Sequence, residues 1–173
     1  MEIVQEIEVS ESHHKAIEAL RNQAFPDSQV NRSYFKQLPH MRALHFQGEQ
    51  LIGYLGLDYR VVRVGEEIHK VLGVIDFCVD ERYRGQGIGS LMLSEVSAFA
   101  ETKDVDFIIL ISELHDFYSS NGFDKVQCMQ SWLRLHEHTN FGVAVEHIDE
   151  LYVKSLRGKP WGVGHFDWLG YMY

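Results

Sequence analysis

The residues whose types and spacing suggest chemistry lie close together, between Arg84 and Ser90. This stretch holds glycine at every second position, at Gly85, Gly87 and Gly89, and a helical segment begins near Ser90. Glycine has no Cβ, so the backbone N–H groups of such a run can converge on one point. Converging N–H donors at the start of a helix favour an anion, above all a phosphate group. The spacing therefore predicts a site for a phosphorylated cofactor, and the adjacent Arg82 adds positive charge.

A strand is expected directly before this loop, because an apolar and largely β-branched run precedes it. Its apolar members are Val71, Leu72, Val74, Ile75, Phe77 and Val79. Two other phosphate motifs are excluded. The loop lacks the Gly-Lys-Ser/Thr ending of a P-loop, and its spacing is not the G-x-G-x-x-G of dinucleotide-binding folds. A plain strand-to-helix turn stays open as the simpler interpretation.

A second pattern follows a segment with helical apolar spacing, which runs from Ser90 to about Thr102. An uninterrupted apolar run over Phe107–Ile111 then predicts a strand that is buried on both faces. The residues F-Y-S-S-N-G-F come next, at Phe117–Phe123. They predict a short helix that Gly122 ends, because glycine at that place readily adopts the left-handed conformation.

Both patterns, in this order, resemble the signatures of the GNAT superfamily of acyl-CoA N-acyltransferases. R-G-x-G-x-G occurs at Arg84–Gly89 and F-Y-x-x-x-G-F at Phe117–Phe123. The resemblance implies an α+β (mixed α/β) fold, in which a strongly twisted mixed sheet with splayed central strands carries helices on both faces. It also implies acetyl-CoA as the acyl donor. The cofactor-binding residues that it implies are Phe77, Cys78, Val79, Arg84, Gly85, Gln86, Gly87, Ile88, Gly89 and Ser90.

The same resemblance gives Tyr118 a chemical role, as the general acid that protonates the departing thiolate. A phenol with a pKa of about 10 lies close enough to a thiol of about 8.5 for that proton transfer. The residues alone favour a different interpretation, in which Tyr118 is an amphipathic core side chain next to Phe117. Because the F-Y-x-x-x-G-F motif matches, we favour the general-acid role for Tyr118.

Asp76 is the candidate general base, since it is a carboxylate inside an apolar strand and charged residues are rare there. In GNAT enzymes a carboxylate at such a place often acts through a water molecule. An equally good interpretation is a hydrogen-bonded acid at a strand bulge. Glu113 and His115 are reserve candidates, and an amine that arrives neutral needs no base at all.

Length and composition predict one small globular domain over residues 1–173, because 45% of the 173 residues are hydrophobic. The net charge of −9 argues against a nucleic-acid surface and weakly suits a cationic acceptor such as an amine. No apolar run reaches the roughly 20 residues of a membrane span, and no signal segment opens the chain. We therefore expect a cytoplasmic protein without membrane contact. Cys78 and Cys128 lack partners at metal spacing, and no metal site is expected.

The remaining elements are placed by their patterns of apolar residues. Strands are expected over 2–9, 41–47, 51–62, 127–135 and 144–155. A helix is expected to run to about Ala24 after a cap at Ser10 or Ser12, and a weaker one over Ser28–Leu38 before Pro39. The tail, residues 156–173, is rich in aromatic residues and glycine, so we expect it to pack on the domain. There it would line the acceptor site, form a dimer contact or cover the sheet.

The function that follows is an acetyl-CoA-dependent N-acetyltransferase that moves an acetyl group directly from CoA to a primary amine of a small molecule. Two alternatives stay open: a non-catalytic acyl-CoA-binding sensor, and an acetyltransferase of protein N-termini or lysines. A dinucleotide-dependent oxidoreductase is disfavoured by the spacing of the glycine loop. The acceptor is not named by the sequence, and a homodimer is left open.

Overall fold

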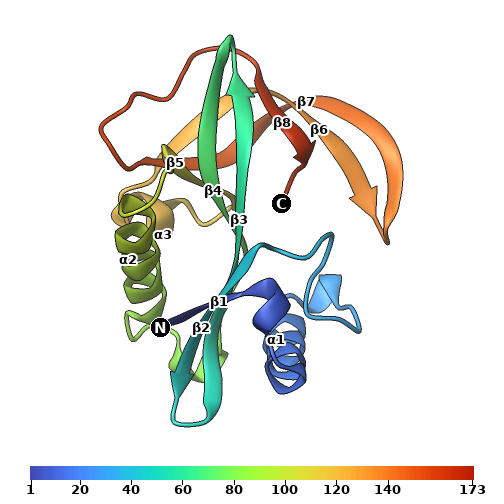
Figure 1. The fold of residues 1–173 in the computed structure, drawn as a ribbon, viewed down its shortest axis with the longest axis vertical. Helices are drawn as coiled ribbons and strands as arrows, with labels where there is room; N and C mark the ends of the chain where they lie inside the picture. Colours follow the sequence, from blue (N-terminus) through green and yellow to red (C-terminus); the bar gives the residue numbers. More distant parts are fainter. The chain divides into compact units, whose positions relative to one another are not determined.

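The computed structural model describes residues 1–173 and contains eight β-strands and three α-helices (Figure 1). The strands are β1 (Glu2–Gln5), β2 (Met41–Gln47), β3 (Gln50–Val64), β4 (Glu67–Val79), β5 (Phe107–Ile111), β6 (Asp124–His136), β7 (Thr139–Ser155) and β8 (Phe166–Tyr171). The helices are α1 (Glu11–Ala24), α2 (Ile88–Glu101) and α3 (His115–Ser120). The predicted mixed α/β class is confirmed. None of the helices has the length and hydrophobicity that a membrane crossing requires.

The chain folds into two compact units. The first consists of Met1–Asp58 and Val74–Val96, and the second of Tyr59–Gly73 and Ser97–Tyr173. Strands β3 and β4 and helix α2 contribute residues to both units. The assignment of residues 1–173 to a single domain stays a prediction.

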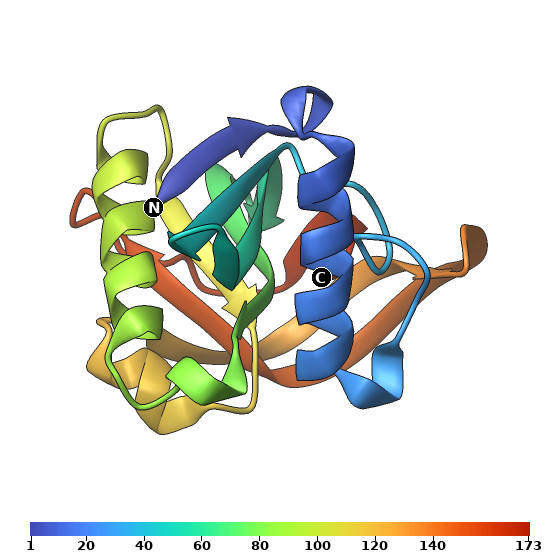
Figure 2. The ribbon, with the colours of Figure 1, turned by 90° about the horizontal axis from the view of Figure 1, so that it is seen from below.

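In the first unit, α1 packs on the antiparallel strands β1, β2 and β3. The helix begins after Ser10, whose hydroxyl accepts a hydrogen bond from the His13 N–H at 3.2 Å and so satisfies one of the free N–H groups of the first turn. Pro26 follows its last turn. The buried core of this unit consists of Ile17, Leu20, Leu44, Leu51, Tyr54 and Cys78. Figure 2 shows α1, in blue, beside these strands.

The helix expected over residues 28–38 is wrong, because this segment runs irregularly after a single 3-10 turn. Its backbone carbonyls are bound by arginine side chains instead of by helical N–H groups. Arg21 Nη1 donates to the Ser28 carbonyl at 2.8 Å, and Arg42 Nη1 donates to the Ser33 carbonyl at 2.5 Å. The buried guanidinium groups thus hold the segment in an irregular, bent path that its apolar spacing does not reveal.

In the second unit, the strand order is β4-β5-β7-β6-β8. The β4–β5 and β6–β8 pairs are parallel, whereas β5–β7 and β6–β7 are antiparallel. The last residues of β3 also pair with β8, through Arg63–Asp167 and Val64–Phe166. Strands β6 and β7 form the long orange hairpin of Figure 1.

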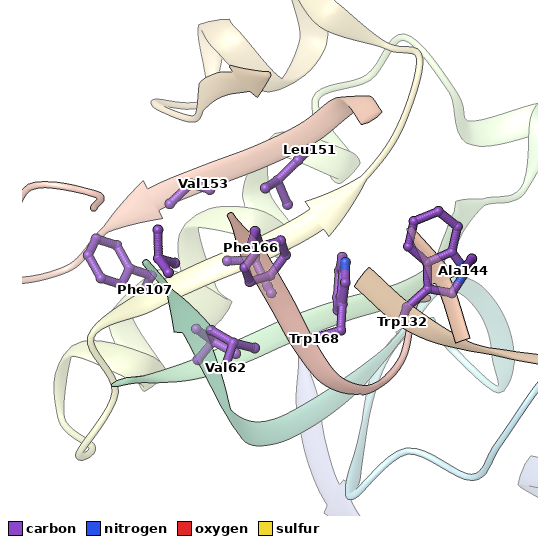
Figure 3. Close-up of a cluster of buried hydrophobic side chains, with 11 residues drawn as sticks. Val62, Phe107, Trp132, Ala144, Leu151, Val153, Phe166 and Trp168 are labelled. Carbon is purple, nitrogen blue, oxygen red and sulfur yellow. The ribbon is translucent and has the colours of Figure 1, made fainter. Parts of the chain in front are cut away.

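Strand β8 lies within the tail and was not predicted. Its Phe166 and Trp168 point into the core of the second unit, among side chains of β3, β5, β6 and β7 (Figure 3). Trp168 is fully buried, and its Nε1 donates to Gln130 Oε1 at 2.8 Å. The buried core consists of Val62, Val64, Val71, Phe107, Ile109, Trp132, Ala144, Leu151, Val153, Phe166 and Trp168. Residues 166–171 of the tail are therefore an integral strand of this unit.

His69 on β4 is a buried imidazole with an exposed fraction of 0%, and neither of its ring nitrogens is hydrogen-bonded. The ring stacks on Trp161 at 5.7 Å and meets Phe107 edge-on at 5.1 Å between centroids. Burial lowers the pKa of His69 below its usual value of 6.5, and Lys159 lowers it further. Glu67, which approaches to 3.7 Å, acts in the opposite direction. The folded state therefore favours the neutral ring.

We expect His69 to make the free energy of unfolding fall with decreasing pH below about 6.5, where the unfolded imidazole gains its proton first. The limit for one group is about 1.4 kcal/mol per pH unit. Above that pH the contribution is constant. Urea unfolding of wild type and of His69→Leu between pH 5 and 8 measures it. As the pH falls from 8 to 5, the free energy of unfolding of wild type should decrease relative to that of His69→Leu. Parallel curves for the two proteins would contradict the prediction.

Candidate functional site

The glycine loop of the sequence lies between the end of β4 and the start of α2. A 3-10 turn at Glu81–Tyr83 opens it, and Asp80 caps this turn by accepting from the Arg82 N–H at 3.0 Å. Arg82 Nη2 also donates to Asp80 Oδ2 at 2.7 Å, and this contact lowers the pKa of Asp80. The charge of Arg82 is thus largely balanced by a buried carboxylate.

Gly85 and Gly87 both have left-handed backbones, with φ of +73° and +80°. A Cβ added at either position would meet no atom within 4 Å, so open space lies beside the loop. The Leu91 N–H donates to the Gly87 carbonyl at 2.9 Å, which makes Gly87 the residue that caps α2. The N–H groups of Ile88, Gly89 and Ser90, the first three residues of α2, have no carbonyl one turn earlier to bind, as at every helix start. Free N–H groups at the start of a helix, next to open space, are a general feature of anion-binding loops.

Arg84 ties the loop to the strand, because its Nε donates to the Val79 carbonyl at 2.9 Å. The side chain is exposed and brings positive charge to the same loop. Gln86 Nε2 donates to the Arg82 carbonyl at 3.3 Å and closes the turn on its other side. Helix α2 begins at Ile88, two residues before the predicted start at Ser90.

Strand β4 pairs with β5 over three residues only, and the last pair is Gly73–Ile109. β4 nevertheless continues to Val79. The final residues of β4, Phe77 to Val79, therefore do not take part in the β5 ladder. Cys78 is buried, and burial raises the pKa of its thiol to about 12, so this cysteine is no nucleophile at neutral pH.

The Tyr173 side chain lies tightly against Gly73, where a Cβ would overlap the phenol ring. The Arg60 guanidinium lies over the same ring, at 4.8 Å from its centroid. We expect Gly73→Ala to displace Tyr173 and to lower the free energy of unfolding by roughly 1–3 kcal/mol, as overpacking does. In a Tyr173→Ala background the same substitution should have little effect. Urea unfolding of the four proteins checks this, and equal losses in both backgrounds would contradict it.

Asp76 interrupts the extended backbone of β4, with φ of +50°. Its Oδ2 accepts from Arg21 Nε at 2.8 Å, and Arg21 comes from α1 of the same unit. Asp76 is thus a hydrogen-bonded acid at an irregularity of the strand, which the sequence allowed as the alternative to a general base. The base role of Asp76 stays a proposal.

Tyr118 lies on α3 in the second unit, and 5% of it is exposed. Its ring packs against Phe117, Phe123 and Tyr152, with centroids 5.0, 5.7 and 5.4 Å away. Burial raises the pKa of Tyr118 to about 12, although the Ser112 hydroxyl acts against this shift. The phenol therefore keeps its proton throughout the physiological range. As predicted, Gly122 ends the helix, with φ of +79°.

The two reserve candidates are both exposed. Glu113 lies between β5 and α3, and His115 Nδ1 lies 3.3 Å from the Tyr152 hydroxyl. Of the predicted site residues, the first unit contains Asp76 and the segments 77–79 and 84–90, and the second contains Tyr118. Sequence reasoning missed Arg21, because its partner Asp76 is 55 residues away along the chain. No three His, Cys, Asp or Glu side chains come together to hold a metal ion.

Residues 43–125, which include the glycine loop and the Tyr118 motif, match the family model of the acetyltransferase (GNAT) domain. The region that holds both sequence motifs is thus similar to a GNAT acetyltransferase domain. The predicted resemblance to this superfamily and the predicted enzyme class, an acyltransferase, are thereby confirmed. The specific acceptor is not given by this match.

Solved structures share the fold at low sequence identity. Escherichia coli ElaA is 16% identical with a TM-score of 0.62, over 89% of this chain and 97% of that one. The GNAT family N-acetyltransferase YhbS of Escherichia coli, solved in complex with CoA, is 19% identical with a TM-score of 0.56, over 88% and 82%. A GNAT acetyltransferase of Staphylococcus aureus is 16% identical with a TM-score of 0.56, over 90% and 99%.

Some similar structures are much longer than this chain. A conserved Enterococcus faecalis protein is 17% identical with a TM-score of 0.58, and the matched region is 32% of that protein. For the GCN5-related N-acetyltransferase of Anabaena variabilis the identity is 12%, the TM-score is 0.59 and the share is 33%. The chain thus spans about a third of these relatives. No curated protein matches the sequence.

Proposed function

We propose that this protein is an acetyl-CoA-dependent N-acetyltransferase that moves the acetyl group directly to a primary amine of a small molecule. The observation that carries the proposal is the glycine loop: two left-handed glycines, open space beside them and a helix start directly after. This arrangement suits a pyrophosphate. The similarity of residues 43–125 to an acetyltransferase family supports CoA as its carrier. The structure of YhbS in complex with CoA agrees with this choice.

The donor would be held by backbone groups. N–H groups of residues 84–90 would bind the pyrophosphate, with Arg84 as the nearby cation. The pantetheine arm is peptide-like, so the backbone of residues 77–79 would hydrogen-bond it as an added strand. In support, these residues lie beyond the last β4–β5 pair at Gly73. A backbone N–H of this segment would also polarise the thioester carbonyl.

The reaction needs one proton donor and one acceptor. The neutral amine attacks the thioester carbonyl, the tetrahedral intermediate collapses, the C–S bond breaks and the thiolate leaves. Tyr118 would give its proton to that thiolate, and the proton lost by the amine would return to solvent or to a base. Asp76 is the one carboxylate of the terminal β4 residues, and it is the candidate for that base. Its buried ion pair with Arg21 favours a structural role instead, and the proton of the amine would then return to solvent.

The acceptor class rests on charge. A net charge of −9 attracts cationic molecules, which favours an amine and disfavours nucleic acid as a partner. We place the enzyme in the cytoplasm, with no membrane partner. Protein N-termini or lysines are the alternative acceptors, and a homodimer is compatible with the exposed apolar side chains of β7, Phe141, Val143 and Val145.

An acetylation screen tests the proposal. Purified protein is mixed with acetyl-CoA and with small amines, lysine peptides or peptides with free N-termini, and the released CoA thiol is measured. Mass spectrometry then identifies the acetylated product. Acetylation of one small-amine class is the expected result, whereas transfer to peptides alone would favour the protein acetyltransferase. Binding of acetyl-CoA without transfer to any acceptor would favour the sensor.

A further inference from the structure

We propose that Arg21 is a positioning residue, which holds the left-handed bend of β4 by clamping Asp76. The bend comes directly before residues 77–79, so the clamp sets the orientation of the backbone proposed to bind the pantetheine arm and the thioester. The inference rests on the proposed function for its catalytic consequence. It gives Asp76 a structural task in place of general base catalysis.

The first observation is that Arg21 is buried and donates hydrogen bonds to two other segments. It is 1% exposed although it comes from a surface helix. Its Nε donates to Asp76 Oδ2 at 2.8 Å, and its Nη1 donates to the Ser28 carbonyl at 2.8 Å. One guanidinium therefore joins three separate parts of the first unit: α1, the segment after it and β4.

The second observation is the aromatic packing of the guanidinium. Its Cζ lies 5.6 Å from the centroid of Phe25 and 5.0 Å from that of Phe35. Cation–π contacts of this kind are attractive and become stronger when they are shielded from water. They also fix the plane of the guanidinium. Arg21 is therefore a rigid anchor, and the carboxylate that it binds is fixed with it.

The third observation is the backbone of Asp76. A left-handed conformation is unfavourable for residues with a Cβ and persists only where the surroundings determine it. The ion pair with Arg21 supplies that determination. Other charged or titratable groups also interact with Asp76: Lys36 from the segment after α1, Tyr54 from β3 and Cys78 from β4. Asp76 thus faces two cations, Arg21 and Lys36, and both attract its carboxylate into this position.

Asp76→Asn separates positioning from base catalysis. Asparagine tolerates the left-handed conformation and still accepts a hydrogen bond from Arg21, but it is no base. Positioning predicts that kcat stays within about fivefold of wild type and that the acidic limb of the pH–rate profile is unchanged. A general base predicts a loss of about 100-fold or more and removal of that limb. The second result would overturn the inference.

Arg21→Met tests the clamp from the other side, because methionine keeps an apolar stem without the charged head. We expect the KM for acetyl-CoA to rise about tenfold or more, as for the loss of a charge-assisted hydrogen bond. Arg21→Lys should restore part of the affinity. Lys15→Met, an exposed lysine of α1 paired only with Glu11 on the surface, is the matched control and should leave KM unchanged.

Hydrogen exchange makes the test independent of turnover. In Arg21→Met, the peptide that covers residues 74–80 should exchange faster than in wild type, whereas the β1–β2 peptides should not change. Equal exchange in this peptide would overturn the inference even if the enzyme acetylates amines. Faster exchange in a protein that neither binds nor transfers acetyl-CoA would retain the clamp and refute the proposed function.

Discussion

Replacing Tyr118 by phenylalanine is expected to lower kcat by about 100-fold or more, with little change in the KM for acetyl-CoA. The substitution removes one hydroxyl from a ring that packs on three aromatic neighbours, so the packing is retained. The lost group is the proposed proton donor for the departing thiolate. Initial-rate kinetics with the acceptor found in the screen measure the effect.

The raised pKa of Tyr118, about 12, affects how it could act as a general acid. Tyr118 is protonated between pH 7 and 10, so its ionisation gives no alkaline limb of the pH–rate profile in this range. Proton transfer to a thiolate with a pKa of about 8.5 would be opposed by about 5 kcal/mol. Removal of water from the thiolate reduces this difference, because desolvation raises the pKa of the thiol as well.

Tyr152→Phe is the matched control. Tyr152 is a buried tyrosine whose ring lies 5.4 Å from that of Tyr118, and its hydroxyl contacts His115. We expect kcat in this variant to stay within a few fold of wild type. Equal activity of Tyr118→Phe and wild type would remove Tyr118 from the mechanism and leave it as a core side chain.

Gly87→Glu is expected to raise the KM for acetyl-CoA by about 100-fold or more, because a carboxylate beside a pyrophosphate is strongly repelled. A Cβ at this position meets no atom within 4 Å, so the substitution starts in open space and no clash at the backbone is expected. Its left-handed backbone adds some strain. Saturation kinetics and the thermal midpoint together separate lost binding from lost stability.

Gly142→Glu controls for strain and for charge. Gly142 on β7 has nearly the same backbone, with φ of +84°, and equally open surroundings. Both variants carry one extra negative charge. A similar rise of KM in both would mean that charge or strain, rather than the loop, is responsible.

The parts of the fold that local sequence determines were predictable. The glycine loop, the strand before it and the helix ended by Gly122 depend on residues next to one another, and each lies where it was expected. The irregular path of residues 28–38 could not be predicted, because Arg42, whose side chain binds the Ser33 carbonyl, lies outside this segment. Local patterns contain no information about such distant donors.

Two further features lay outside a local interpretation. Phe166 and Trp168 are two residues apart, as buried residues are in a half-buried strand. The many other aromatic residues of the tail hide this alternation. The Arg21–Asp76 ion pair joins residues 55 positions apart and depends on where α1 docks. Asp76 could be singled out from the sequence as a charged residue in an apolar strand. Its partner Arg21 could be identified only from the structure.

Calorimetric titration of the wild-type protein with acetyl-CoA tests the central claim most directly, with CoA and NADH titrated in parallel. We predict saturable binding of acetyl-CoA and CoA and none of NADH. A ligand at 100 times its Kd should then stabilise the fold by about 2.7 kcal/mol, which a thermal melt of the same samples detects. No binding of either CoA species to a cooperatively folded protein would contradict the account, and the glycine loop would then be only a turn.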